Sequence, residues 1–352
     1  MHDSIPHLVG VTVAVPARLH LGFFDLSETP GRRFGGMGLA VDDLKTSITI
    51  RRARRTGPFG RAEALHQKKP ATAESDRALR YLQAMEQALA VVGSHELSVA
   101  ELTPAHAGLG SGTQLALAVA AGLRRLHGLP LDVEADALTL GRGSRSGIGI
   151  GLFHRGGLVV DGGHGDRPGA APIISHLPFP DSWRVILVLE PGRRGVHGAD
   201  EATTFATLPP MSEADAAHIC RLVLMKALPA IAERDLANFG AAVTEMQARL
   251  GDHFASRQGG ARFTSPDVAA VLETLAGAGA AGIGQSSWGP TGFAFAPSAA
   301  AAERLVAMAR THPRSRGLDI RVCRGLNRGA EIVAHAESLR DADSQRDSQK
   351  TG

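Results

Sequence analysis

Apolar and polar residues alternate along several stretches of the chain, a pattern typical of half-buried β-strands. Residues 8–15 and 44–52 show it near the start, with many β-branched side chains. Segment 16–43, between them, is rich in glycine and ionisable groups and too irregular to assign to an element. Further strands are predicted at residues 96–102, 156–161, 183–191 and 318–323, with a strand–turn–strand over 280–296.

Other stretches place apolar residues at helical spacing. Between residues 75 and 92 the apolar positions Leu79, Leu82, Met85, Leu89 and Val92 would share one helix face. Helices are also predicted over residues 113–127, 132–141, 212–227, 230–251, 265–276 and 298–311. Runs of strands interleaved with helices, without strict strand–helix alternation, favour the α+β class.

The length of 352 residues suggests two domains or one large unit. A Pro/Gly-rich stretch at residues 162–181 is the predicted boundary. We therefore expect an N-terminal domain over residues 1–165 and a C-terminal domain over residues 182–336. Residues 337–352 have no apolar period, and we expect a disordered tail there.

Composition narrows the classes of protein that fit. Hydrophobic residues make up 43% of the chain, which excludes wholesale disorder, and aromatic residues only 4%, which disfavours base-stacking platforms for nucleic acid. The net charge of +3 is concentrated in residues 51–69, with seven basic residues and one acidic residue. A solvated loop is favoured there over a nucleic-acid or anion surface.

The spacing of the cysteines and the length of the apolar segments indicate the cellular compartment of the protein. Cys220 and Cys323 lie far apart in sequence without metal-ligand spacing. The first ten residues do not resemble a signal peptide, and the longest apolar run is far shorter than a membrane span. We expect a cytoplasmic protein with neither a membrane nor a nucleic acid as partner.

The strongest local signal is the glycine-rich segment at residues 104–115, PAHAGLGSGTQL. Glycines at 108, 110 and 112 allow a tight turn and a close backbone approach to a ligand. The helix that follows presents unpaired N–H groups and the positive end of its dipole, which together bind anions. Ser111 and Thr113 add hydroxyl donors, so the segment predicts a phosphate site, although a capped turn without a ligand is the alternative.

This segment resembles the phosphate loop of the GHMP kinase superfamily. Two other landmarks of that superfamily stand in the right order: PARLHLG at residues 16–22 and GIGQSSWGPTG at residues 282–292. One departure matters, because Gly149 stands where related kinases carry a catalytic aspartate. Without that carboxylate the chain lacks the usual base for an acceptor hydroxyl, although homoserine kinases manage without it.

The full pattern resembles one branch, the β-ribofuranosylaminobenzene 5′-phosphate synthase family. Its segments are PARLHLGFFDL, GRRFGGMGL, GLGSGTQLAL, GRGSRSGIGIG and GGLVVDGGH. The resemblance implies a GHMP-kinase-like fold, with an N-terminal half like ribosomal protein S5 domain 2 and a ferredoxin-like C-terminal half. It also implies decarboxylating ribosyl transfer from 5-phosphoribosyl 1-diphosphate to 4-aminobenzoate or 4-hydroxybenzoate, in methanopterin biosynthesis, by a homodimer.

The donor in that reaction is highly anionic, and arginines recur beside the glycine-rich clusters. Mg²⁺ would be held mainly through the diphosphate of the substrate, so no protein metal cage is expected. We predict Asp25, Arg32 and His20 as catalytic residues. The predicted substrate-binding residues are Arg18, Gly108, Gly110, Ser111, Gly112, Thr113, Gln114, Arg142, Arg145, Arg155, His197, Gln285 and Ser286.

Two other functions stay open from the sequence. An ATP-dependent kinase of small molecules would carry out phosphoryl transfer. A catalytically inactive binding protein on the same fold would bind ligand without turnover. The sequence does not decide between the amino and hydroxy acceptors.

Overall fold

The computed structural model describes residues 8–27, 29, 31–53, 73–166, 168–196 and 198–336, without the side chains of residues 198–200 and 202. The basic stretch beyond residue 53 and the predicted tail at 337–352 lie outside these residues. Every predicted helix and strand that falls within them is present, with shifted bounds in places.

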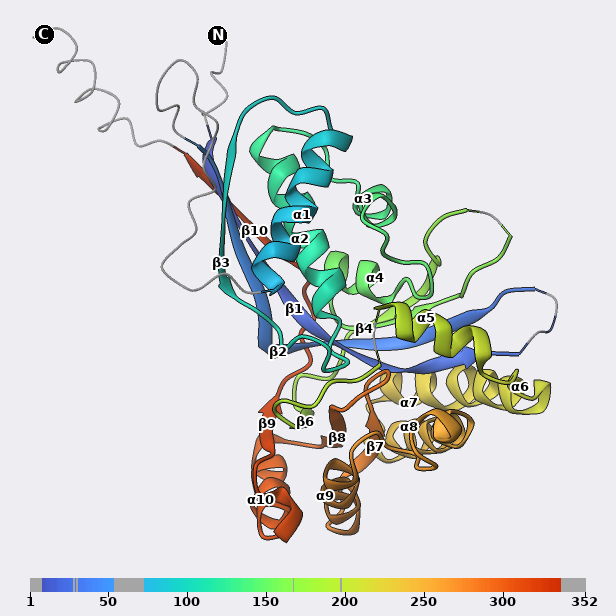
Figure 1. Cartoon of the computed structure of the whole chain (residues 1–352). Coiled ribbons are helices and arrows are strands. Elements are labelled where there is room, and N and C mark those ends of the chain that lie inside the picture. Colours follow the sequence, from blue (N-terminus) through green and yellow to red (C-terminus); the bar gives the residue numbers. More distant parts are fainter. Residues whose placement is uncertain are drawn as a thin grey trace, which may run out of the picture.

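The first sheet has six strands (Figure 1). Its order is β10 (Glu331–Ala336), β1 (Leu8–Asp25), β2 (Phe34–Arg52), β4 (Leu158–Asp161) and β5 (Ile173–Leu177), and β3 (His95–Glu101) also pairs with β2. The second sheet has the order β7 (Ala281–Gln285), β8 (Gly292–Ala296), β6 (Arg184–Leu189) and β9 (Asp319–Cys323). Within the described residues the paired strands of both sheets run antiparallel, as expected for an α+β fold.

The segment left unassigned between the first two predicted strands is itself extended. β1 runs on to Asp25 and β2 begins at Phe34, so the two strands form one long hairpin. From Pro16 to Phe24 almost every residue of β1 is buried, so the side chains on both faces of the strand are covered. A strand covered on both faces shows no apolar–polar alternation, which explains why the pattern of the sequence does not reveal it.

Helices cover the first sheet on one face (Figure 1). They are α1 (Ala73–Ala88), α2 (Ser111–Leu126), α3 (Val133–Thr139) and α4 (Ile148–Arg155). Helix α2 is apolar almost all round and nearly wholly buried, packing on β1, β2 and α1. This alanine-rich helix fixes the position of its own N-terminus, where the glycine-rich segment lies.

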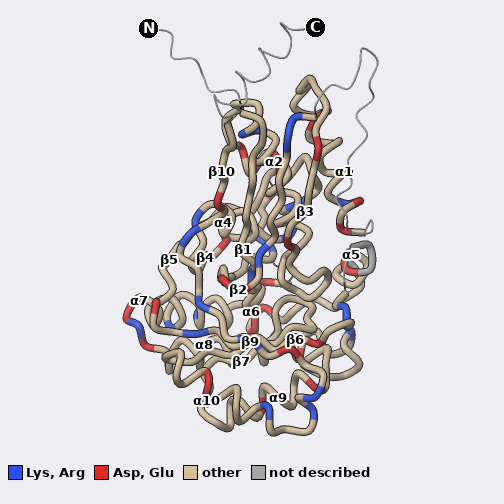
Figure 2. The backbone as a smooth tube through the Cα atoms, turned by 90° about the vertical axis from the view of Figure 1, so that its left-hand side faces the viewer, with Lys and Arg blue, Asp and Glu red and all other residues tan. Residues whose placement is uncertain are grey.

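The second sheet carries α9 (Pro266–Gly277) and α10 (Ala299–Arg310) on one face. The other helices of this half are α5 (Gly198–Thr207), α6 (Glu213–Leu222), α7 (Leu228–Glu233) and α8 (Leu236–Phe254), with a π-helical turn at Val223–Ala227 between α6 and α7. Helix α8 begins later than predicted because the side chain of Asp235 accepts a hydrogen bond from the backbone of Asn238 and caps it. In Figure 2 acidic and basic positions are interspersed in the part of the chain around α7 and α9.

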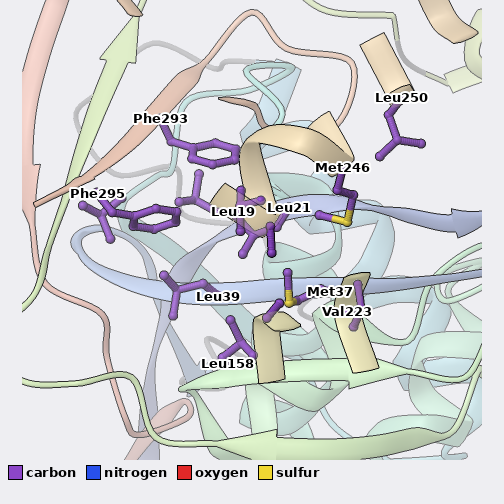
Figure 3. Packing of buried hydrophobic residues seen from close by; sticks show 14 of the residues in the cluster. Leu19, Leu21, Met37, Leu39, Leu158, Val223, Met246, Leu250, Phe293 and Phe295 are labelled. Atoms are coloured by element: carbon purple, nitrogen blue, oxygen red, sulfur yellow. The ribbon is translucent and has the colours of Figure 1, made fainter. Parts of the chain in front are cut away.

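One core joins the two sheets (Figure 3). Leu19 and Leu21 of β1 meet Met246 and Leu250 of α8, and Phe293 and Phe295 of β8 lie in the same cluster. β10 pairs with β1 although it comes from the end of the chain. The division at residues 165 and 182 stays a prediction, and the first sheet draws strands from both sides of it.

Candidate active site

A cavity of about 360 Å³ opens where the first sheet, α2, α4 and the β7–β8 loop meet, within the size range of small-molecule sites. Arg18 and His20 project from β1, and the glycine-rich segment contributes Gly108, Gly110, Ser111, Gly112 and Thr113. The loop before α4 adds residues 141–146, and the β7–β8 loop adds residues 287–289. The three motifs picked out in the sequence therefore converge on one cavity.

Ser286 ties these three segments together. Its hydroxyl donates to the carbonyl of Gly108 at 2.8 Å and accepts from the backbone N–H of His20 at 3.0 Å. A side chain at Gly108 would run into the carbonyl of Ser286, and the φ of +81° also favours glycine there. Ser286 itself is fully buried and positions the cavity wall.

The N-terminus of α2 faces the cavity without a side-chain cap. Its N-cap Gly110 has a φ of 74° and no capping side chain. A Cβ at Gly110 would collide with the side chain of Arg18, so glycine is required there for the arginine to pass. The first amides of α2 and the Arg18 guanidinium therefore form an anion-binding end of the cavity.

Arg18 is the most unusual charge in this region. Its Nε and Nη1 atoms are buried and have no hydrogen-bond partner among the described residues. Burial lowers the pKa of Arg18 from its usual value, and the charges of Glu201 and Asp161 oppose that shift. Leaving a guanidinium buried and unpaired is costly, and an anionic ligand would offset that cost.

Gly149 faces the same guanidinium. A Cβ built at this position would lie 2.8 Å from Cγ2 of Thr113 and 3.8 Å from Nε of Arg18. A carboxylate at this position would therefore reach Arg18 and neutralise it. The glycine that removes the kinase base thus also leaves Arg18 free for a phosphate.

Three more arginines line the cavity. Arg142 hydrogen-bonds the hydroxyl of Tyr81 and lies over its ring, with its Nε unpartnered within the described part of the chain. Arg145 pairs with Glu201 at 2.7 Å. Arg77 of α1 was missed by the sequence reasoning and lies 3.4 Å from Nε2 of His106. Arg77 stands on a predicted helix outside the glycine-rich segments, so no motif in the sequence indicated a role for it in the site.

Two residues of the lining hold a strained backbone. His106 has a φ of 58° and Ser287 a φ of 54°, in the left-handed region that favours glycine. Backbone strain in non-glycine residues concentrates at functional sites. Ser287 belongs to the glycine-rich motif at residues 282–292, which the sequence indicated as part of the site, whereas His106 was not predicted as a site residue.

His20 lies at the inner wall, 2% exposed, and neither ring nitrogen has a partner in the described structure. Burial, followed by the charge of Arg18, lowers the pKa of His20 to about 3, so the ring is neutral at physiological pH. A neutral imidazole has one donor and one acceptor nitrogen.

Other predicted residues lie outside the cavity lining. Asp25 accepts from the N–H and hydroxyl of Ser27, at 2.8 and 2.6 Å, so it caps its own turn. Arg32 donates to the carbonyls of Gly162 and Gly163 at 2.6 and 2.5 Å. Their predicted catalytic role stays a prediction, and this placement does not support it.

Four other predicted binding residues also lie outside the lining of the main cavity: Ser286, described above, Gln114, Arg155 and Gln285. Gln114 is fully buried in α2 with both amide atoms unpartnered among the residues described. Arg155 is exposed at the end of α4. Gln285 bonds the N–H of Thr264 and the side chain of Gln258, which holds the β7–β8 loop. The predicted residue His197 lies outside the described residues.

Asp161 was missed as a residue of the site framework. One carboxylate oxygen accepts from the N–H of Gly147 and the hydroxyl of Ser146, at 2.9 and 3.0 Å, and the other from the N–H of Gly163 at 2.9 Å. Burial raises the pKa of Asp161, and these hydrogen bonds oppose the rise. This carboxylate fixes the start of α4 beside the cavity.

No group of three or more metal-ligating side chains occurs among the residues that the structure describes. The carboxylate in the lining is that of Glu201, and the hydroxyls of Ser111 and Thr113 belong to the same lining. Such a sparse set of oxygens fits Mg²⁺ only when substrate phosphates supply most ligands. In the described part of the chain no helix has the length and apolarity to cross a membrane.

Comparison with known proteins agrees with this geometry. The family model for the GHMP kinases N terminal domain matches residues 76–151, and that for the GHMP kinases C terminal region matches residues 227–314. A homoserine kinase from Cytophaga hutchinsonii has a TM-score of 0.64 at 16% identity, covering 95% of this chain and 99% of that one. The mevalonate diphosphate decarboxylase of Enterococcus faecalis has a TM-score of 0.61 at 14% identity, covering 93% and 99%. These similarities confirm the predicted GHMP-kinase-like α+β fold.

Relatives with closer sequences come from archaea. The β-ribofuranosylphenol 5′-phosphate synthase of Archaeoglobus fulgidus is 35% identical over 335 residues, 90% of this chain and 97% of that protein. The protein of the same name from Methanothermobacter thermautotrophicus is 32% identical over 298 residues, 80% of this chain and 88% of that one. With the three motifs gathered around one cavity, the chain belongs to the β-ribofuranosylphenol 5′-phosphate synthase family of the GHMP kinase superfamily.

Proposed function

We propose that this protein is an enzyme that transfers a ribosyl 5-phosphate group from 5-phosphoribosyl 1-diphosphate to a 4-substituted benzoate, with loss of CO₂ and diphosphate. The single observation that carries the proposal is the position of Arg18 beside the uncapped N-terminus of α2, where its Nε and Nη1 atoms are buried and have no hydrogen-bond partner among the described residues. The names of the relatives support it, because their product is a ribofuranosyl phosphate joined to a phenol ring.

The arrangement of charge suits the donor. Four arginines and one carboxylate line the cavity, so its net charge complements a diphosphate and a phosphate. Arg18 and the first amides of α2 would hold one anionic group. Arg142, which stands beside Gly112, would hold the other. Departing diphosphate gains negative charge, and donors already in place stabilise that charge.

The chemistry balances without an external oxidant or base. The bond between C1 of the ribose and the diphosphate oxygen breaks, and its electron pair leaves with diphosphate. The ring carbon that bears the carboxylate then forms a bond to C1. When the carboxylate leaves as CO₂, the pair from that bond restores the aromatic ring. No acceptor hydroxyl needs activation, so the glycine at 149 in place of a kinase base is consistent with the reaction.

Mg²⁺ would neutralise the diphosphate leaving group when it is bound. Glu201, Ser111 and Thr113 of the cavity lining would contact it. Cytoplasmic location and a homodimeric state complete the proposal on the strength of the resemblance. The pathway proposed is methanopterin biosynthesis.

The test is release of labelled CO₂. Purified protein is incubated with Mg²⁺, 5-phosphoribosyl 1-diphosphate and carboxyl-labelled 4-hydroxybenzoate or 4-aminobenzoate. We expect CO₂ release that requires the donor, with equal formation of diphosphate. Arg314→Ala serves as the control for protein preparation, because Arg314 lies on the surface of the second half, where it pairs with Asp267. Phosphorylation of a metabolite from ATP without CO₂ release would instead establish the kinase alternative, and ligand binding with no turnover would establish a binding protein.

A further inference from the structure

Four of the few aromatic residues of this chain gather beside the cavity. Phe23, Phe205, Phe254 and Trp288 form a connected group, here called the aromatic wall. The Phe254 and Trp288 ring centroids lie 4.4 Å apart, those of Phe205 and Trp288 lie 5.3 Å apart, and those of Phe23 and Phe205 lie 5.7 Å apart. In a protein with only 12 Phe, 2 Trp and 1 Tyr, such a group beside a polar cavity needs an explanation.

Part of this wall faces ligand space. Phe23 and Trp288 line the main cavity together with Val196. Phe23, Phe254 and Trp288 also line a small adjoining cavity of about 20 Å³. His20 and Ser287 border both cavities, so the wall lies directly beside the arginine-lined cavity.

Two polar groups in this part of the site lack partners. His20 is 2% exposed and Trp288 is 3% exposed. Both ring nitrogens of His20 and Nε1 of Trp288 make no hydrogen bond to any described residue. The His20 ring lies 4.5 Å from that of Phe23, at the edge of the wall. Buried polar atoms are normally paired, so these two point to a ligand that has both apolar and hydrogen-bonding parts.

The proposed reaction, on which this inference rests, sets the direction of the acceptor. Its carboxylate-bearing carbon must face C1 of the donor, and the donor phosphates belong at the arginine-lined end. The substituent in the para position then points away from C1 of the donor. The aromatic wall and His20 lie beside the arginines, since Arg145 lies 5.4 Å from the ring centre of Phe205, and they offer the acceptor an apolar surface and ring nitrogens.

We infer that the aromatic wall binds the ring of the benzoate acceptor and that His20 accepts a hydrogen bond from its para hydroxyl or amino group. The ring stacks against Phe23 and Trp288, which favours flat aromatic acids over aliphatic ones. A hydrogen bond donated by the para substituent raises electron density in the ring as it attacks C1. His20 therefore both selects the acceptor and increases its reactivity, while the arginines select the donor.

Fluorescence offers a direct binding test because the chain has two tryptophans. Trp183 lies in the core against Phe179 and Phe239, whereas Trp288 lines the cavity. In the Trp183→Phe variant we expect 4-hydroxybenzoate to quench the emission saturably. In Trp288→Phe, which retains only the core tryptophan, we expect no saturable change. Saturable quenching in Trp288→Phe but not in Trp183→Phe would overturn the inference.

Steady-state kinetics separates the two ends of the site. His20→Phe keeps a ring beside Phe23 and removes the acceptor nitrogen. We expect it to raise the KM for 4-hydroxybenzoate at least about tenfold and to change the KM for the donor less than about twofold. His20→Asn, which restores a hydrogen-bonding side chain, should recover part of the loss. His154→Phe, on the outer face of α4, is the matched control and should change neither KM.

The outcomes distinguish this inference from the proposed function. If the wild-type protein releases CO₂ but His20→Phe keeps its KM for the benzoate, the acceptor site is wrong and the function stands. If the donor KM rises instead, His20 belongs to the donor site and the inference fails. If the wild-type protein binds the benzoate at Trp288 without CO₂ release, the proposed reaction fails and the aromatic site stands. Thermal unfolding of each variant shows whether it is folded.

Discussion

Two places on the same hairpin carry charged residues that looked equally functional in the sequence. In the middle of β1, Arg18 has buried guanidinium nitrogens without partners among the described residues. At the hairpin end, Asp25 and Arg32 have their polar atoms paired with neighbouring backbone groups. A group already satisfied by its own fold has little left to offer a ligand, whereas an unsatisfied buried group requires one. Whether a charged side chain already has hydrogen-bond partners in the fold, more than its residue type, therefore distinguishes the site from the scaffold.

The largest effect is expected for Arg18→Met. We expect kcat/KM for the donor to fall at least about a hundredfold, because a charged hydrogen-bonding group is lost from the phosphate end. The free energy of unfolding should stay equal or rise, since an unpaired buried charge has been removed. Urea unfolding and initial-rate kinetics measure both.

Arg124 provides the matched control for Arg18. It forms two hydrogen bonds of 2.7 Å with the carboxylate of Asp136, away from the cavity. Arg124→Met should destabilise the fold by about 1–3 kcal/mol and leave donor KM unchanged. If the two arginine variants behaved alike, partner satisfaction would not distinguish the site from the scaffold.

Asp161→Asn tests the framework that holds the cavity. The NH₂ group of the new amide would face the N–H of either Gly147 or Gly163, so one of these contacts becomes unfavourable. We expect a loss of about 1–3 kcal/mol in the free energy of unfolding and a fall in kcat. An unchanged melting temperature would contradict the framework role.

The pH dependence of stability tests His20. Its pKa in the folded state is lowered to about 3, below the usual value of 6.5. The unfolded chain therefore binds the proton first, and stability contributed by the neutral ring falls as the pH drops from about 6.5 towards 3. The slope from this one group is at most about 1.4 kcal/mol per pH unit.

The comparison that isolates this contribution is His20→Phe against the wild-type protein. The variant should lose less free energy of unfolding between pH 6.5 and pH 4, as measured by urea denaturation at each pH. Parallel stability profiles for the two proteins would show that the ring is not held neutral by the fold.

The smallest effects are expected at the hairpin end. Asp25→Asn and Arg32→Ala each remove contacts that are local or partly exposed, so we expect losses of about 1 kcal/mol or less in stability. Turnover should stay within about threefold of the wild-type value. A fall of two or more orders of magnitude with unchanged stability would instead establish the catalytic role that the sequence suggested.

Much of the fold could be predicted from local pattern. Helices such as α9 and α10 lie within about one residue of their predicted bounds because amphipathic spacing and capping serines are local signals. The missed elements lack such signals. β10 pairs with a strand more than 300 residues earlier, and β5 lies inside a segment whose prolines and glycines indicated a linker.

The candidate site divides in the same manner. The glycine-rich segment and Arg18 were predicted because close backbone approach and phosphate binding demand particular residue types. Arg77, His106 and Asp161 were missed because their roles depend on which distant segments they meet. The aromatic wall joins residues from β1, α5, α8 and the β7–β8 loop, and no spacing in one dimension reveals that meeting.

The pairing of β10 with β1 has a consequence for biogenesis. A nascent chain that has emerged only as far as α10 exposes one edge of its first sheet, with the unpaired N–H and C=O groups of β1 open to other strands. β10 can cover that edge only after residues 331–336, the last ones that the structure describes, have left the ribosome. Chains that end about a dozen residues before Ala336 lack β10. They would therefore be prone to associate through the exposed edge of β1, even if their catalytic residues were intact.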